Sequence, residues 1–129
     1  MIESQHFYTL SIDILQYCYI SKYMVERVDQ IKALSNESRI EILRLLDDPA
    51  RNFGHQESAD PARVGVCVNL IAERLGLSQP TTSRHIELLR RAGFLRIRRQ
   101  QKWSYCSRDE TALANYYDWL RKELSIRSA

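Results

Sequence analysis

The segment from Ser78 to Lys102, SQPTTSRHIELLRRAGFLRIRRQQK, carries the side chains best suited to chemistry in this chain of 129 residues. Its polar groups are amides, hydroxyls and guanidinium groups, which form hydrogen bonds with phosphates and with the edges of nucleic-acid bases. Thr82, Ile86 and Leu89 recur at helical spacing and are expected to face a core. The polar side chains between them then form an exposed face suited to binding DNA.

The residues before and after this helix predict a helix-turn-helix with a wing. Gly76 closes a short apolar helix, and Ser78 is placed to cap the second one. An alternating segment follows, with a turn at Gln100-Gln101-Lys102, as in a β-hairpin. We therefore expect one domain over 1–129 that is mainly α with a small β-hairpin. The helix-turn-helix covers 69–93 and the wing covers 94–107.

In this arrangement the second helix lies in the major groove of double-stranded DNA, and the wing follows the backbone or enters the minor groove. The candidate DNA-contacting residues are Ser78, Gln79, Thr81, Thr82, Ser83, Arg84, His85, Arg98, Arg99, Gln101 and Lys102. Arg84 is the candidate for a guanine or a phosphate, and Gln79 for an adenine. Alternatively, Arg84 pairs with Glu87 or Glu41 on the surface. For His85 we expect a structural or phosphate-contacting role rather than a metal-binding one.

The charge distribution favours the same partner. From Val64 to Arg108, nine basic side chains stand against two acidic ones, a net charge of +7. The whole chain carries +3, so the remainder carries −4. A basic block beside an acidic remainder is typical of a nucleic-acid-binding surface. An ordinary solvated surface is the alternative interpretation.

Two predicted helices near the ends of the chain carry more apolar surface than one core requires. Residues 1–23 show two apolar stripes, whereas a surface helix needs one. Residues 109–125 show a broad aromatic and aliphatic face. We expect these helices to join two subunits into a homodimer; burial within one subunit is the alternative. The candidate interface residues are Phe7, Leu10, Ile14, Tyr17, Leu113, Tyr116, Tyr117, Leu120 and Leu124.

The middle of the chain gives weaker signals. Asn36 is expected to cap a helix whose core face includes Ile40, Leu43 and Leu46. Residues 51–63 contain few apolar side chains and several turn formers, which predicts a loop insertion. The next five residues, 64–68, form either a short strand or the lead into a helix, because periodicity alone does not separate the two.

Cys18, Cys67 and Cys106 are candidates for a redox switch. Their number is odd and no C-x-x-C pair occurs, so neither a disulfide framework nor a zinc knuckle is indicated. No residue nearby in the sequence lowers a thiol pKa, so buried, inert cysteines are the simpler expectation. The sequence shows neither a secretion signal nor a membrane-spanning run, and we expect a cytoplasmic protein without a membrane partner.

Four sequence motifs together resemble the ArsR/SmtB family of winged-helix repressors over about residues 28–120. They are KALSNESRI at 32–40, LSQPTTSRHI at 77–86, LRRAG at 89–93 and RRQQKW at 98–103. The resemblance implies a homodimer, joined by its N- and C-terminal helices, that binds a palindromic operator and represses. It also implies that an effector lowers the affinity for DNA.

The chain departs from this family at both of its common metal sites. Many members carry Cys-Val-Cys just before the first helix of the helix-turn-helix, where this chain has Val66-Cys67-Val68. One thiolate is too few for a soft-metal site. The other common zinc site uses histidines of the C-terminal helix, and 109–125 contains none. We therefore expect no metal and no cofactor, and the effector stays unidentified.

The sequence thus favours a sequence-specific DNA-binding transcriptional regulator that acts as a repressor. A first alternative is a winged-helix module that works through protein contacts, as a co-regulator or an antitoxin-like partner. A second is a repressor that senses oxidants through its thiols. An enzyme is not expected, because the chain contains no glycine-rich phosphate loop, no H-E-x-x-H motif and no nucleophile elbow.

Overall fold

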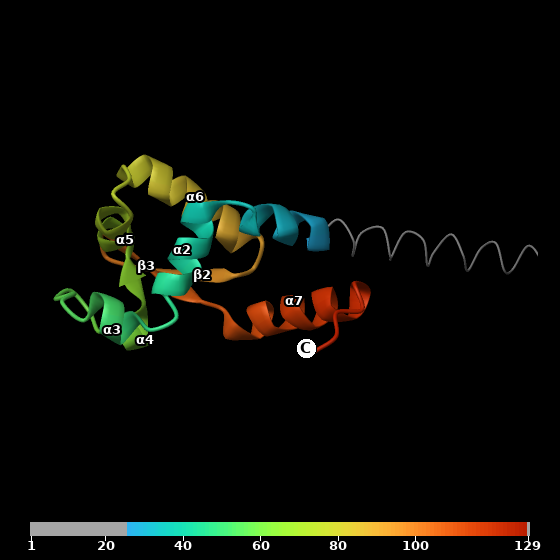
Figure 1. Cartoon of the computed structure of the whole chain (residues 1–129). Coiled ribbons are helices and arrows are strands. Elements are labelled where there is room, and N and C mark those ends of the chain that lie inside the picture. Colours follow the sequence, from blue (N-terminus) through green and yellow to red (C-terminus); the bar gives the residue numbers. More distant parts are fainter. Residues whose placement is uncertain (1–25, 129) are drawn as a thin grey trace, which may run out of the picture.

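The computed structural model describes residues 26–128 and shows a mainly helical fold with one small antiparallel sheet (Figure 1). Residues 26–34 are helical. The elements that follow are α2 (Glu37–Leu45), α3 (Pro49–Phe53), α4 (Pro61–Val64), β1 (Val66–Cys67), α5 (Val68–Leu75), α6 (Gln79–Arg91), β2 (Leu95–Gln100), β3 (Trp103–Arg108) and α7 (Glu110–Glu123). The predicted fold class is confirmed, with α5 and α6 as the helix-turn-helix and β2 and β3 as the wing. Within the described part, no helix is long and apolar enough to cross a membrane.

The predicted N-terminal helix over 1–23 lies outside the described residues. So do its candidate interface residues and the first cysteine: Phe7, Leu10, Ile14, Tyr17 and Cys18.

Local sequence signals fix the ends of the helices as predicted. The side chain of Asn36 accepts a hydrogen bond from the backbone N–H of Arg39 at the start of α2, and Ser78 does the same for Thr81 at the start of α6. Gly76 ends α5 in the left-handed conformation, with φ of 67°. A side chain at this φ is strained, so glycine suits the turn between α5 and α6.

The sheet has the order β1-β3-β2, and all of its pairs are antiparallel. Gln100 pairs with Trp103 in the hairpin, which leaves a two-residue turn at its tip. Both interpretations of residues 64–68 hold. Val66 and Cys67 form the strand β1, and α5 begins directly after it at Val68.

One apolar core joins α2, α5, α6 and the sheet. Its fully buried side chains include Ile42, Ile71, Ile86, Leu89 and Phe94. The predicted core face of α6 is confirmed, because Ile86 and Leu89 lie in this core.

The core face of α2 was predicted correctly only in part. Leu43 and Leu46 are buried, but Ile40 is 38% exposed. The structure turns Ile42 and Leu45 inward instead. The prediction for Ile40 was therefore wrong, because apolar residues on two sides of this helix competed for the core.

The prediction of a loop insertion over 51–63 was also wrong in part. The segment contains the end of α3 and the start of α4, which lie side by side at one end of the molecule, next to β1 (Figure 1). Phe53 is only 1% exposed and joins the main core. Between the two helices, the amide of Gln56 donates to the carbonyl oxygens of Ala59 and Gly65 and accepts from the N–H of Cys67. The segment is held to the sheet by these bonds.

The packing of this segment predicts a large stability effect for Phe53→Ala. Removing a fully buried aromatic ring leaves a cavity, and we expect a loss of about 3 to 5 kcal/mol in the free energy of unfolding. Urea denaturation at fixed protein concentration measures it. Arg51→Ala, an exposed change on the same short helix, is the matched control and should shift the midpoint little. Equal midpoints for both variants would show that the segment does not contribute to the core.

Candidate DNA interface

The outward face of α6 presents most of the predicted polar residues. Gln79, Thr81, Ser83 and Arg84 are exposed. The hydroxyl of Ser78 is engaged at the helix start, where it donates to the hydroxyl of Thr81 at 2.9 Å. The hydroxyl of Thr81 accepts that bond and keeps its own proton, so Thr81 remains open to a partner together with Gln79, Ser83 and Arg84.

Thr82 was wrongly included among the DNA-contacting candidates. Its side chain is fully buried, and its hydroxyl donates to the carbonyl oxygen of Ser78 at 2.9 Å. A hydroxyl that bonds back to the carbonyl four residues earlier is satisfied inside its own helix. Thr82 is thus part of the core face of α6.

His85 lies at the contact between α6 and α2. Its Nδ1 lies 3.1 Å from Nη1 of Arg39, which donates the hydrogen bond, since a guanidinium has no acceptor. Burial lowers the pKa of His85, and the charges of Arg39 and Arg84 lower it further. The neutral ring therefore accepts from Arg39, which supports the structural role among the two that the sequence indicated.

A hollow of about 350 Å³ lies between α6, the start of α5 and the wing. It is lined by Cys67, Val68, Asn69, Gln79, Ser83, Arg99, Lys102, Trp103 and Ser104. The structure thus brings two predicted residues of α6 together with two predicted cations of the wing. Arg98 precedes Arg99 on a strand, so it projects from the opposite face of the hairpin. Gln101 lies at the exposed tip, with φ of 54°.

Acidic side chains neutralise one subset of the basic block. Arg90 and Arg91 both pair with Glu87, with N–O distances of 2.7 and 3.2 Å. Farther along, Arg96 pairs with Asp109, and Arg108 pairs with Glu110. These two Arg–carboxylate pairs fasten the wing to the start of α7.

The predicted DNA-contacting cations are among those that form no ion pair with an acidic side chain; Arg74 of α5, which was not predicted, is the other such cation of the basic block 64–108. Within residues 26–128, no ion pair involves Arg84, Arg98, Arg99 or Lys102. The alternative that Arg84 pairs with Glu87 or Glu41 is not what the structure shows, because those carboxylates bind Arg90, Arg91 and Arg44. The hydrogen bond from Arg90 is the largest influence that lowers the pKa of Glu87, to about 2. Glu87 therefore stays charged at neutral pH.

Two residues of the hollow were missed from the sequence. Asn69 lies in the first turn of α5, the position from which the first helix of a helix-turn-helix approaches the DNA backbone. Trp103 follows Lys102 in the hairpin, and Nζ of Lys102 lies 5.1 Å from the centre of its ring. This cation–π contact orients the ammonium group. Trp103 could have been predicted from the sequence, because an aromatic residue directly follows the basic turn.

Comparison with known proteins places this chain in a family. A family described as a helix-turn-helix domain matches residues 59–98. HlyU from Vibrio cholerae is 26% identical, with a TM-score of 0.53 over 78% of this chain and 94% of that chain. A homodimeric winged helix-turn-helix DNA-binding domain from Mycobacterium bovis, a possible ArsR-family regulator, shares the fold, with 19% identity and a TM-score of 0.55 over 84% and 87% of the two chains.

The HTH-type transcriptional regulator YbzH of Bacillus subtilis is 40% identical over 100 residues, which are 78% of this chain and all of that protein. The chain belongs to the helix-turn-helix-type transcriptional regulators. It is a DNA-binding regulator, and the prediction that it is not an enzyme is confirmed by this membership.

The two described cysteines of the regulator are poorly placed for a thiol switch. Both are buried. Burial raises the pKa of Cys106 to about 12, with a further contribution from Cys67 nearby. Because Val66 pairs with Cys106 and Cys67 with Tyr105, the two thiols project from opposite faces of the sheet. This geometry disfavours a disulfide between them.

The predicted interface residues in the C-terminal part of the chain fall into two groups, one packed against the core and one exposed to solvent. Tyr116 packs edge-on against Phe94 of its own chain, with ring centres 5.4 Å apart, and Leu113 and Leu120 also pack against the core. Tyr117 and Leu124, in contrast, are 63% and 64% exposed. Tyr116 is therefore a core residue, which corrects its assignment to the interface, and the open apolar surface of α7 is centred on Tyr117 and Leu124.

The unpaired cations predict a contrast between arginines of one helix. Arg84→Ala should weaken specific DNA binding by roughly ten- to a hundredfold, on the order of 1–3 kcal/mol. Arg90→Ala is the matched control and should have a smaller effect, because Arg90 is bound to Glu87. Arg99→Ala should weaken binding to all sequences and reduce the slope of log K against log salt by about one. Fluorescence anisotropy measures all three. Equal losses for the Arg84 and Arg90 variants would contradict this assignment.

The buried thiols predict slow alkylation. In a Cys18→Ser background, Cys67 and Cys106 should react with iodoacetamide at pH 8 only when the regulator is unfolded, because both thiols are buried away from the reagent in the folded state. Mass spectrometry of native and urea-treated samples gives the comparison. Alkylation of either cysteine within minutes in the native state would restore the thiol-sensing alternative.

Proposed function

We propose that the regulator is a repressor that binds a palindromic operator as a homodimer. Recognition helix α6 lies in the major groove, with Gln79, Ser83 and Arg84 directed at bases and phosphates. The wing places Arg99 and Lys102 against the backbone beside that groove. The observation that carries the proposal is the hollow between α6 and the wing, where unpaired cations and uncommitted polar groups of two elements meet.

The homodimer is supported by the exposed apolar side chains of α7 and by the fold it shares with the homodimeric domain from Mycobacterium bovis. Large apolar side chains gathered on one exposed face indicate an interaction surface. A two-fold dimer presents two copies of α6, so its binding site has two related half-sites, and the operator is palindromic.

The Val66-Cys67-Val68 segment supports a regulator without the soft-metal site that many ArsR/SmtB proteins carry at this position. The side chains of Val66 and Val68 occupy the positions of the two thiols, and both are buried in the core. They contribute to folding instead of offering donor atoms to an ion. The protein-interaction alternative explains the unpaired cations less directly, because a phosphate backbone is the partner that such a polar, basic hollow fits best.

The experiment that tests this function compares DNA from the region upstream of the regulator's own gene with a scrambled duplex. Fluorescence anisotropy over a salt series should show a preference of roughly a thousandfold and a steep salt slope. Equal and weak binding to both duplexes would contradict a sequence-specific repressor and favour the protein-interaction module.

Because Tyr117 is exposed on α7 whereas Tyr116 is buried in the core, we predict that Tyr117→Asp separates the two subunits of the proposed dimer. A carboxylate in the middle of an apolar interface is desolvated without a partner, so we expect a monomer in sedimentation velocity with an unchanged circular dichroism spectrum. Thr111→Asp, which adds the same charge to an exposed position of the same helix, should leave the assembly intact. A Tyr117→Asp variant that sediments like the unmodified protein would place the interface elsewhere.

A further inference from the structure

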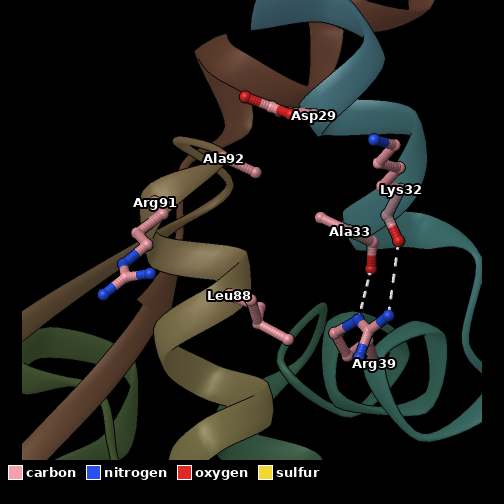
Figure 2. A pocket seen from close by; sticks show the side chains of 7 residues that line it. All are labelled: Asp29, Lys32, Ala33, Arg39, Leu88, Arg91 and Ala92. Atoms are coloured by element: carbon pink, nitrogen blue, oxygen red, sulfur yellow. Dashed lines mark hydrogen bonds between the residues drawn. The ribbon is translucent and has the colours of Figure 1, made fainter.

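A hollow of about 400 Å³ lies between the helical segment 26–34 and the C-terminal half of α6 (Figure 2). It is lined by Asp29, Lys32, Ala33, Arg39, Leu88, Arg91 and Ala92. Its size is within the range of sites for small metabolites. It lies behind the recognition helix, away from the hollow between α6 and the wing, and shares no lining residue with it.

One side of this hollow is apolar, formed by three of its seven lining residues. Figure 2 shows the side chain of Leu88 pointing from α6 toward the space between the helices, with Ala33 and Ala92 beside that space. The guanidinium of Arg91 points away from it and is bound to Glu87. An apolar group of a ligand therefore fits against Leu88 and the two alanines.

The rim of the hollow carries two opposite charges without partners. Asp29 and Lys32 lie one turn apart on the same helix, a spacing at which opposite charges commonly pair. Across residues 26–128, neither of them takes part in an ion pair, with the other or with a third residue. One carboxylate and one ammonium group are thus open to a ligand at the same edge.

The surrounding backbone disfavours a ligand with a single charge. Segment 26–34 and α6 both end beside the hollow, which is lined by Ala33 in the last turn of the segment and by Ala92, the C-cap of α6, and helix C-termini carry partial negative charge. These ends and Asp29 oppose a simple anion, whereas Lys32 and Arg39 oppose a simple cation. A zwitterion with an apolar group meets all three features: the acid, the base and the apolar surface.

We propose that this hollow binds an α-amino acid with an apolar side chain. The ammonium group of the amino acid donates to the carboxylate of Asp29, its carboxylate accepts from Nζ of Lys32, and its side chain packs on Leu88. Both polar contacts are between opposite charges, which makes them the stronger kind of hydrogen bond.

The position of the hollow connects such a ligand with DNA binding. Arg39 ties segment 26–34 to α6: its Nε donates to the carbonyl oxygen of Ala33 at 2.6 Å and its Nη2 to that of Lys32 at 3.3 Å, while Nη1 donates to His85 (the carbonyl bonds are dashed in Figure 2). The amide of Gln30 adds a bond to the carbonyl oxygen of Ala92. A carboxylate beside Lys32 competes for Arg39 and loosens this connection. The amino acid therefore weakens DNA binding, an effect that rests on the proposed function.

Titration calorimetry without DNA tests the site itself. The probes are leucine, methionine and phenylalanine, followed for the tightest binder by its amide, which lacks the carboxylate, and its deaminated acid, which lacks the ammonium group. We expect each analogue to bind at least about tenfold more weakly than the amino acid. Asp29→Asn and Lys32→Met should cause losses of the same size. Both side chains are exposed, so the fold should be kept.

Asp118→Asn and Lys122→Met are matched controls, because both residues are exposed on α7 and neither lines the hollow. The proposal is overturned if no probe binds, if the analogues bind as well as the amino acid, or if the Asp29 and Lys32 variants bind like the controls. The DNA affinity of the unliganded protein tests the proposed function separately. A ligand that binds as expected but leaves that affinity unchanged would overturn the link to DNA.

Discussion

The burial of one face of α6 determines where its polar side chains point. Ile86 and Leu89 lie in the core, and Thr82 is placed beside them by its bond to Ser78. Because side chains three and four positions apart share a helix face, this contact fixes the rotation of α6 about its axis. Gln79, Ser83 and Arg84 then have to face outward. The hollow beside the wing depends on that rotation, since two of its lining residues come from α6.

Ion pairs divide the basic residues into two functional groups. Carboxylates at the end of α6 and at the start of α7 bind four arginines. The two pairs of Glu87 lie within α6, whereas the pairs of Asp109 and Glu110 join the wing to the start of α7. Surface pairs of this kind contribute little to stability. Their effect on function is larger, because they leave Arg84, Arg98, Arg99 and Lys102, with Arg74 of α5, as the uncompensated charges of the basic block 64–108. The electrostatic field of the interface is therefore concentrated where α6 and the wing meet.

The parts predicted correctly from the sequence depend on local chemistry. Caps at Asn36 and Ser78, the glycine turn at Gly76 and the alternation of the hairpin involve neighbours a few residues apart. The errors involve distant partners. Phe53 is buried by a core that its own segment does not reveal, and Gln56 finds its acceptors up to nine residues away. Asn69 and Trp103 join the site only when α5 and the hairpin are placed next to α6. The hollow at Asp29 and Lys32 likewise exists only between two packed helices.

The two edges of the sheet have a consequence for association between molecules. An exposed strand edge offers unpaired backbone groups to any other chain, which is a route to aggregation. At β1 the amide of Gln56 already occupies the N–H of Cys67. At β2, the other edge, Arg98 and Arg99 form no ion pair within residues 26–128, and their positive charge repels a second copy of the same strand. The arginines of the wing thus also act against cross-β assembly, so a variant stripped of them for weaker DNA binding would lose this protection as well.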